Sequence, residues 1–299
     1  MHIAFNGWFW NQPFTGSGQY LRKLAAALRT LSPELRMTLV IPAGESPAEL
    51  PAGIDVIPVD ISLPGHLGKV WFEQRGFPRE AAASGADVFH VPYWGSPLRA
   101  AQPVVCSVLD MIPLAIPQYR TGLKNRLYTS LVSASAQGAD HILTISEASK
   151  RDIVQMLGVS GERVTVTPLA VDKSFQPQID RREDDAIRTK YGVDDVDDFV
   201  LYLGSYSVHK NVRLLLAAYT YVAQAMGDDV PLVLAGRTPE TWGTPRFPDL
   251  PAYIDELGLS DFVRWAGPVD EADKAALYRA AKVFVFPSRY EGFGFGPLE

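Results

Sequence analysis

The feature that most constrains the fold is the alternation of short apolar runs with helical patterns along the whole chain. Most of the runs are apolar on both faces, which is typical of parallel strands covered by helices on each side. Helical periodicity is clear in residues 19–31, 211–226 and 271–281, and in a helix that follows Ser146, a predicted N-cap. The predicted strands are residues 2–6, 37–42, 87–91, 104–109, 141–145, 164–167, 199–203, 232–235, 262–265 and 283–286.

A polar, charge-dense stretch interrupts this alternation at residues 173–198. Alternation on both sides of it predicts two doubly wound α/β domains, residues 1–172 and 199–299, joined by a charged linker. Ligands of such sheets bind at the carboxyl ends of the strands, so we expect the site in a cleft between the domains. The sequence ends directly after a strand–loop motif, which predicts that the second domain is incomplete.

Charge and composition exclude several classes of protein. The formal net charge of −6 argues against nucleic-acid binding, which needs a basic face. A single cysteine, Cys106, excludes an intramolecular disulfide and a multi-cysteine zinc site. Every apolar run is shorter than the roughly 18 residues of a membrane span, and the N-terminus lacks the pattern of a signal peptide. We therefore expect a cytoplasmic protein.

Two strand–helix loops carry residues suited to an anion. Gly16 and Gly18 open the first predicted helix, where backbone amides can approach a ligand closely. Lys210 and Asn211 open another helix, where a lysine opposes the positive end of the helix dipole unless an anion binds. A simple turn and a solvated lysine are the alternative interpretations.

The third loop, residues 287–299, gives the strongest signal. It contains Gly292, Gly294 and Gly296, whose neighbouring amides could hold a diphosphate. Glu291 and Glu299 flank these glycines with seven residues between them, so one carboxylate could bond sugar hydroxyls and the other a ribose. A glycine-rich turn with two surface glutamates does not explain why both acids border the same anion-binding turn.

These segments together resemble the group 1 family of retaining glycosyltransferases, which have the GT-B architecture: two Rossmann-like domains facing a cleft. Glu291 and Glu299 match the family's E-x7-E motif, and Lys210 lies in a matching phosphate loop. The matches occur in order and cover nearly the whole chain. The other matching segments are 16–18, 145–150, 204–211 and 265–269.

The resemblance implies that a nucleotide sugar binds mostly to the second domain and the acceptor mostly to the first. Lys210 would bind the diphosphate, Glu291 the donor sugar and Glu299 the ribose. No metal or further cofactor is implied; Asp195-Val196-Asp197 has the letters of a metal motif but precedes a strand, so we interpret it as solvated charge. The other implied donor-binding residues are Gly16, Gly18, Asn211, Val269, Gly292, Phe293 and Gly294.

The chain departs from the family pattern near the implied catalytic residues, which are Asp110, His90 and Glu291. Leu109 stands where the family often has a histidine before the aspartate, Asp110. His90 could face the cleft, or it could be a buried structural histidine. His209 replaces an arginine that often precedes the phosphate lysine, which could change affinity or pH dependence.

Donor and acceptor are less constrained. Residues 110–114 are similar to a segment of bacterial mannosyl- and rhamnosyltransferases, which favours GDP-mannose over UDP-glucose as the donor. The expected acceptor is a glycan or a lipid-linked saccharide. Leu123, Leu127 and Leu131 form a helical stripe near Lys124 and Arg126. This stripe could make a peripheral contact with an anionic membrane. Core packing with a basic solvent face is the favoured interpretation.

Two alternatives to a transferase stay open. A binding protein could keep the nucleotide site without turnover, and a sugar-nucleotide epimerase could share the architecture. The epimerase would need acid–base residues around the sugar, and no convincing set is present. A nicotinamide dehydrogenase is disfavoured, because the first loop lacks a third glycine and no acid ends the second strand.

Overall fold

A computed structural model describes residues 1–44, 46–177 and 182–299; for residues 182–184 it describes the backbone alone. The chain divides into two compact units. The first comprises Met1–Leu114 and Gly122–Pro168, and the second comprises Ala115–Thr121 and Leu169–Glu299. The predicted linker includes residues 178–181, which lie outside the described part.

The first unit is built on a parallel sheet that has seven strands among the described residues, in the order β3-β2-β1-β4-β5-β6-β7. Six were predicted from the sequence, and β3 was missed. The main helices are α1 (Gly16–Leu31), α2 (Gly65–Trp71), α3 (Phe77–Ala83), α5 (Leu123–Gly138) and α6 (Glu147–Leu157). The strands are β1 (His2–Asn6), β2 (Arg36–Pro42), β3 (Ile54–Val59), β4 (Val88–Val91), β5 (Val104–Ser107), β6 (His141–Thr144) and β7 (Val164–Val166).

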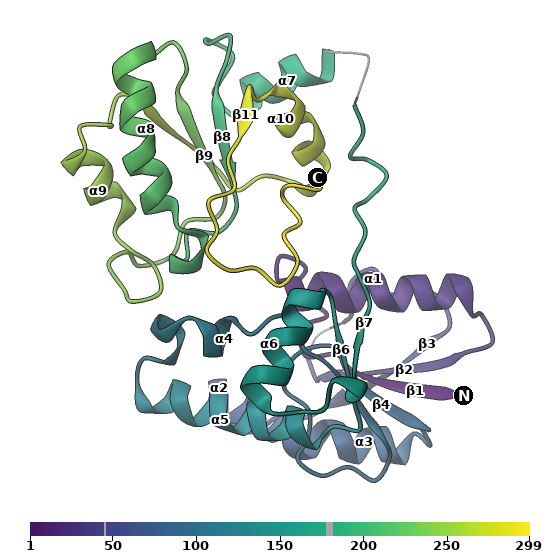
Figure 1. The fold of residues 1–299 in the computed structure, drawn as a ribbon. Helices are drawn as coiled ribbons and strands as arrows, with labels where there is room; N and C mark the ends of the chain where they lie inside the picture. Colours follow the sequence, from purple (N-terminus) through teal and green to yellow (C-terminus); the bar gives the residue numbers. More distant parts are fainter. Residues whose placement is uncertain (45, 178–181) are drawn as a thin grey trace. The chain divides into compact units, whose positions relative to one another are not determined.

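Helices cover both faces of this sheet, as the two-sided apolar strands predict (Figure 1). On one face, α1 packs Leu21 and Ala25 against Phe5 and Met37 of the strands. On the other face, Phe77 of α3 stacks edge-on against Phe89 of β4, with ring centroids 5.8 Å apart. A π-helical turn, Phe72–Gly76, joins α2 to α3. Short helices lie at Gly161–Arg163 and at Ile112–Ala115 (α4); the 3-10 turn Pro117–Arg120, which follows α4, belongs to the second unit.

The second unit has a parallel sheet whose four strands, within the described ranges, follow the order β10-β9-β8-β11. The strands are β8 (Val200–Leu203), β9 (Leu232–Ala235), β10 (Val263–Gly267) and β11 (Val283–Phe284). Helices α8 (Val212–Met226) and α9 (Leu250–Glu256) cover one face, and α7 (Arg182–Lys190) and α10 (Lys274–Ala280) cover the other (Figure 1). The two doubly wound α/β units confirm the predicted fold class.

Two features differ from the sequence expectations. The stretch at 173–198 contains α7, whose Ile187 packs against the buried core of the second unit that includes Val193 and Leu277. The prediction that the stripe on α5 packs into the core is wrong for its first two leucines, because Leu123 is 72% exposed and Leu127 is 62% exposed. The buried residues of this helix are Thr129, Val132, Ser135 and Ala136.

Candidate functional site

Two loops of the second unit leave the sheet at neighbouring strand ends. One follows β8 and runs through a short 3-10 turn, Val208–Lys210, into α8, and the other follows β11. Asn211 caps α8 in the left-handed conformation, with φ of 58°, and its Nδ2 donates to the carbonyl of Pro287 at 3.2 Å. The amide of Arg289 donates to the carbonyl of His209 at 2.8 Å. These bonds hold the two loops together.

An ion pair joins the two loops at their side chains. Lys210 Nζ lies 2.7 Å from Glu291 Oε1, and both side chains are about one-fifth exposed. The ammonium also lies 5.6 Å from the centre of the Phe286 ring. The structure therefore brings together two predicted donor-binding residues that are 81 positions apart. Lys210 ends the 3-10 turn and lies two positions before the first residue of α8.

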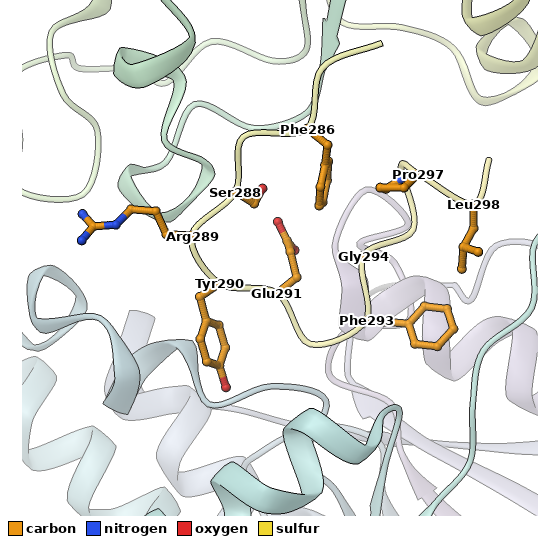
Figure 2. Close-up of a pocket in the computed structure, with 9 residues that line it drawn as sticks. All are labelled: Phe286, Ser288, Arg289, Tyr290, Glu291, Phe293, Gly294, Pro297 and Leu298. Carbon is orange, nitrogen blue, oxygen red and sulfur yellow. The ribbon is translucent and has the colours of Figure 1, made fainter.

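A pocket of about 500 Å³ opens beside this ion pair (Figure 2). Glu291, Phe293 and Gly294, all predicted site residues, line it. Figure 2 shows the Glu291 carboxylate extending toward Ser288 and Phe286, whereas the Arg289 side chain extends away from them. The full lining consists of Phe286, Ser288, Arg289, Tyr290, Glu291, Phe293, Gly294, Pro297 and Leu298.

Sequence reasoning missed Ser288 as a pocket residue. Its Oγ is buried and has no hydrogen-bond partner among the residues that the structure describes. A buried hydroxyl without a partner is costly, so it is a candidate contact for a polar ligand. The available signal was its position between the predicted strand and Glu291, where a parallel strand ends.

The second glutamate of the motif lies elsewhere. Glu299 Oε2 accepts a hydrogen bond from the Tyr278 hydroxyl of α10 at 3.1 Å, and Glu299 is not among the residues that line the pocket. Burial and then the charge of Glu299 raise the pKa of Tyr278 well above its ordinary value, so the hydroxyl stays a donor. The last residues of the chain form a turn, in which the Glu299 amide donates to the Phe295 carbonyl at 3.0 Å.

Three glycines pack at the carboxyl ends of the second sheet. Gly236 has φ of 143°, and a Cβ there would lie 1.9 Å from the carbonyl oxygen of Gly204. The Gly236 amide donates to the Gly267 carbonyl at 2.7 Å. Sequence reasoning missed Gly236, because a single glycine after a strand has no distinctive spacing.

Val269, expected to contact the base through its backbone, packs its side chain against the core beneath β8 and β9.

His209 is uncharged at neutral pH. Burial, together with the positive charge of Lys210, lowers the pKa of His209 to about 4. Its Nδ1 lies 2.8 Å from the hydroxyl of Tyr119, which belongs to the same unit, and 3.2 Å from Ser207 Oγ. The histidine therefore adds no positive charge beside Lys210 above about pH 5.

The glycine loop of the first unit forms the first turn of α1. Thr15 caps this helix by accepting the Gly18 amide on its Oγ1 at 3.1 Å. A Cβ on Gly18 would lie 2.2 Å from the Gln12 carbonyl oxygen, whereas a Cβ on Gly16 would meet nothing within 4 Å. Gly18 is thus required by local packing, and Gly16 faces open space.

The two other implied catalytic residues have contrasting environments. Asp110 is partly exposed beyond the end of β5, and its Oδ1 accepts the Ile112 amide at 2.9 Å at the start of α4. His90 is 6% exposed within β4, and its Nε2 lies 2.8 Å from Ser107 Oγ. Burial lowers the pKa of His90 to about 4. These contacts support the interpretation of His90 as a buried structural histidine.

The aspartates of the Asp-x-Asp letters lie outside the pocket lining. Asp195, part of the Asp-x-Asp letters, pairs with Arg264, with Oδ2 and a guanidinium nitrogen 3.0 Å apart. Within the described part of the chain, no group of three or more His, Cys, Asp or Glu side chains is arranged to hold a metal ion.

Two family models match the chain. Residues 183–299 match the family described as "Glycosyl transferases group 1", and residues 14–175 match "Glycosyltransferase Family 4". The second match covers more than half of the chain. The chain therefore belongs to glycosyltransferase family 4, which confirms the resemblance drawn from the sequence.

Individual relatives are distant. O-antigen chain mannosyltransferase B of Escherichia coli is 29% identical over 213 residues, which cover 71% of this chain and 54% of the relative. The chain spans 54% of the length of this relative and 24% of the length of the serotype-specific mannosyltransferase WbdA of Escherichia coli. Sucrose-phosphate synthase of Thermosynechococcus elongatus superposes with a TM-score of 0.71 at 19% identity, covering 98% of this chain and 77% of that one. HepE of Anabaena, solved with UDP and glucose, superposes with a TM-score of 0.69 at 19% identity, covering 99% of this chain and 76% of that one.

Proposed function

We propose that the protein is a retaining glycosyltransferase that moves a hexose from a nucleotide sugar to a glycan or a lipid-linked saccharide. The observation that carries the proposal is the pair of Lys210 and Glu291 beside the pocket, on two loops that hydrogen bonds hold together. A cation and a carboxylate side by side suit a ligand with a diphosphate next to a polyhydroxylated ring.

The residues of the second unit suit the departure of a nucleoside diphosphate. Lys210, just before the positive N-terminal end of α8, would stabilise the negative charge that develops on the leaving phosphate. Glu291 would accept hydrogen bonds from the sugar hydroxyls. Asn211, Val269, Gly292, Phe293 and Gly294 are the further proposed donor contacts, and Glu299 is the proposed ribose contact.

The first unit would hold the acceptor. Its proposed reactive-site residue is Asp110, at the carboxyl end of the sheet beyond β5. Gly16 and Gly18, which lack side chains, would let the diphosphate lie close to the backbone at the start of α1. The acceptor hydroxyl would attack from the face that the diphosphate leaves, which retains the anomeric configuration. His90 was also expected at the reactive site; its burial favours a structural role instead.

We propose GDP-mannose as the donor in preference to UDP-glucose. Two kinds of support agree: a sequence segment and the names of two relatives. Residues 110–114 resemble a segment of bacterial mannosyl- and rhamnosyltransferases. The E. coli relative is named a mannosyltransferase. A relative from Mycolicibacterium hassiacum that is 32% identical over 165 residues is named MMP alpha-(1->4)-mannosyltransferase. The alignment with that relative covers 55% of this chain.

We also propose that the protein works in the cytoplasm, with peripheral contact at the inner face of the membrane. None of the helices in the described ranges is both long and apolar enough to cross a bilayer. A lipid-linked acceptor would bring the protein to that surface.

Ligand-dependent thermal stability tests the donor site. The chain is heated with GDP, UDP, ADP, GDP-mannose, UDP-glucose or NAD, without added metal, and the unfolding midpoint is measured. A ligand that binds only the folded state raises the midpoint according to its occupancy. We expect GDP and GDP-mannose to raise it, and Lys210→Ala to abolish the shift.

The matched control is Lys282→Ala, which removes an exposed lysine that pairs with Asp198. This variant should keep the full ligand response. A response to NAD alone, or to no nucleotide, would contradict the transferase proposal. Binding without transfer to any acceptor would favour the binding protein, and conversion of the free nucleotide sugar would favour the epimerase.

A further inference from the structure

A second pocket, of about 260 Å³, lies in the second unit. The segment Ala115–Thr121, which belongs to this unit, supplies one wall, and the loops after β8 and β11 supply the other. Arg289 lines this pocket and the larger one, so the two spaces are neighbours. The other polar residues of its lining are Gln118 and His209, and none of the proposed donor contacts lines it.

Hydrogen bonds hold the walls of this second pocket together. The Tyr119 hydroxyl lies 2.8 Å from His209 Nδ1, and the Arg289 amide donates to the His209 carbonyl at 2.8 Å. The Val208 amide donates to the Arg246 carbonyl at 2.8 Å. These contacts join four separate segments of the chain. The pocket is therefore formed before any ligand binds, which lowers the entropic cost of binding.

Two arginines bring positive charge to the second pocket. The Arg289 side chain is exposed and extends away from the Glu291 carboxylate (Figure 2). The Arg246 guanidinium lies over the Tyr119 ring, 4.8 Å from its centre. In the part of the chain that the structure describes, neither guanidinium has a carboxylate partner, whereas Glu291 is paired with Lys210. On a chain of net charge −6, two such arginines at one pocket indicate an anionic ligand.

The environment of His209 agrees with a positive potential at this wall. Burial is the main cause that lowers the pKa of His209 to about 4. The charges of Lys210 and Arg246 lower it further, against the opposing charge of Glu291. The imidazole is thus neutral near pH 7 and leaves the arginines as the charged groups of the pocket.

The size and the apolar part of the second pocket restrict the ligand. Its volume of about 260 Å³ lies below the roughly 300–1,000 Å³ of pockets that hold drug-sized molecules. A guanidinium binds a phosphate through two parallel hydrogen bonds, and an apolar wall suits the carbon atoms attached to that phosphate. The pocket therefore suits a small phosphate ester better than a nucleotide. The apolar lining consists of Ala115, Ile116, Pro117 and Val208.

We propose that the second pocket binds the phosphate group of a phosphorylated acceptor. The Arg289 guanidinium would bond the phosphate oxygens, and Arg246 would add positive charge beside them. A phosphate monoester carries up to two negative charges near neutral pH, so it can satisfy both arginines, which a carboxylate cannot. That the ligand is an acceptor rests on the proposed transferase function, because Arg289 sets the phosphate next to the donor pocket. The binding of the anion can be measured without transfer.

Calorimetric titration of the chain in the presence of GDP tests the second pocket. The probes are glycerol 3-phosphate, inorganic phosphate, D-glycerate and glycerol, all at one ionic strength because salt screens the attraction. We expect glycerol 3-phosphate to bind roughly threefold more tightly than inorganic phosphate, since its carbon atoms contact the apolar wall. Glycerate should bind roughly tenfold more weakly than glycerol 3-phosphate, because it has one negative charge, and glycerol should not bind.

Two variants and a matched control locate the binding. Arg289→Gln should weaken glycerol 3-phosphate binding roughly tenfold or more, because charge-assisted hydrogen bonds are lost. Ala115→Leu keeps every arginine but fills the pocket, so it should weaken binding as strongly. The control is Arg213→Gln, which removes an exposed guanidinium of α8 that lies 4.0 Å from the centre of the Tyr253 ring. This control should bind like the unmodified chain, and circular dichroism should show that all variants fold.

Four results would overturn the proposal. The first is no binding of glycerol 3-phosphate by the unmodified chain, and the second is unchanged binding by folded Arg289→Gln or Ala115→Leu. The third is glycerate binding as tight as that of glycerol 3-phosphate. The fourth is equally tight binding of inorganic phosphate, which would assign the pocket to free phosphate. Titration with GDP alone tests the donor site separately: binding of glycerol 3-phosphate without binding of GDP would contradict the donor site and support the anion pocket.

Discussion

The same added methyl group should have different effects at the two glycines of the first loop. It should lower the stability of the protein at Gly18 and weaken ligand binding at Gly16. A Cβ on Gly18 would lie 2.2 Å from the Gln12 carbonyl oxygen and 2.7 Å from the Phe9 carbonyl oxygen. The Gln12 amide donates to the Phe9 carbonyl at 3.0 Å, and Trp10 between them is 1% exposed, so this turn cannot shift freely. We expect Gly18→Ala to cost about 3 kcal/mol of unfolding free energy, as overpacked sites do.

Gly16→Ala should be nearly neutral for folding. No atom lies within 4 Å of the added Cβ, and alanine is a better helix former than glycine at the start of α1. For a unit of this size, about 3 kcal/mol corresponds to a midpoint lowered by roughly 6–12 °C in Gly18→Ala, with little change in Gly16→Ala.

Thermal unfolding by circular dichroism measures both variants, and calorimetric titration with GDP measures the donor site. Gly16→Ala should weaken GDP binding although it folds normally, because the methyl group enters the space proposed for the diphosphate. A Gly18→Ala variant as stable as the unmodified chain would refute the packing argument. An unchanged GDP affinity in Gly16→Ala would remove Gly16 from the proposed site.

Three further outcomes are expected. Because the pKa of His90 is about 4 when folded and 6.5 in the ordinary unfolded chain, the unfolded state binds the extra proton between these values. Stability should therefore fall as the pH drops from 6.5 to 4, by up to about 1.4 kcal/mol per pH unit, and urea titrations should show a shallower fall in His90→Gln. Gly236→Ala should unfold or be poorly expressed, since its Cβ would collide with the Gly204 carbonyl at 1.9 Å; a normal melting curve would contradict this. Ser288→Ala should leave the unliganded midpoint unchanged or higher, because its hydroxyl has no described partner, yet weaken GDP-mannose binding in calorimetry.

Most of the strands could be predicted, because buried parallel strands are continuous apolar runs. Strand β3 (Ile54–Val59) was missed because this edge strand buries only its first and last residues and includes Asp55 and Pro58, so it lacks a continuous apolar run. Helix α7 was missed because the stretch around it is so rich in charge, and packing of Ile187 against the core outweighs that composition. Such tertiary effects are not visible in local sequence.

The site was predictable in its motifs and not in its geometry. The family resemblance assigned Lys210 and Glu291 to one donor site, and the structure pairs them. Periodicity on α5 placed Leu123 and Leu127 on one face, but only the packing of neighbouring elements decides whether that face is buried. The same limit applies to Glu299, because the spacing of the motif does not reveal its hydrogen-bond partner Tyr278 on α10.

The bond between Lys210 and Glu291 makes their substitutions non-additive. Each side chain neutralises the other at 2.7 Å, so removing one leaves the remaining charge partly buried without its partner. The effect of Lys210→Ala on ligand binding therefore includes a change in Glu291. A double-mutant cycle with Lys210→Met and Glu291→Gln would give the coupling energy directly and separate the ligand's own contacts from the resting interaction.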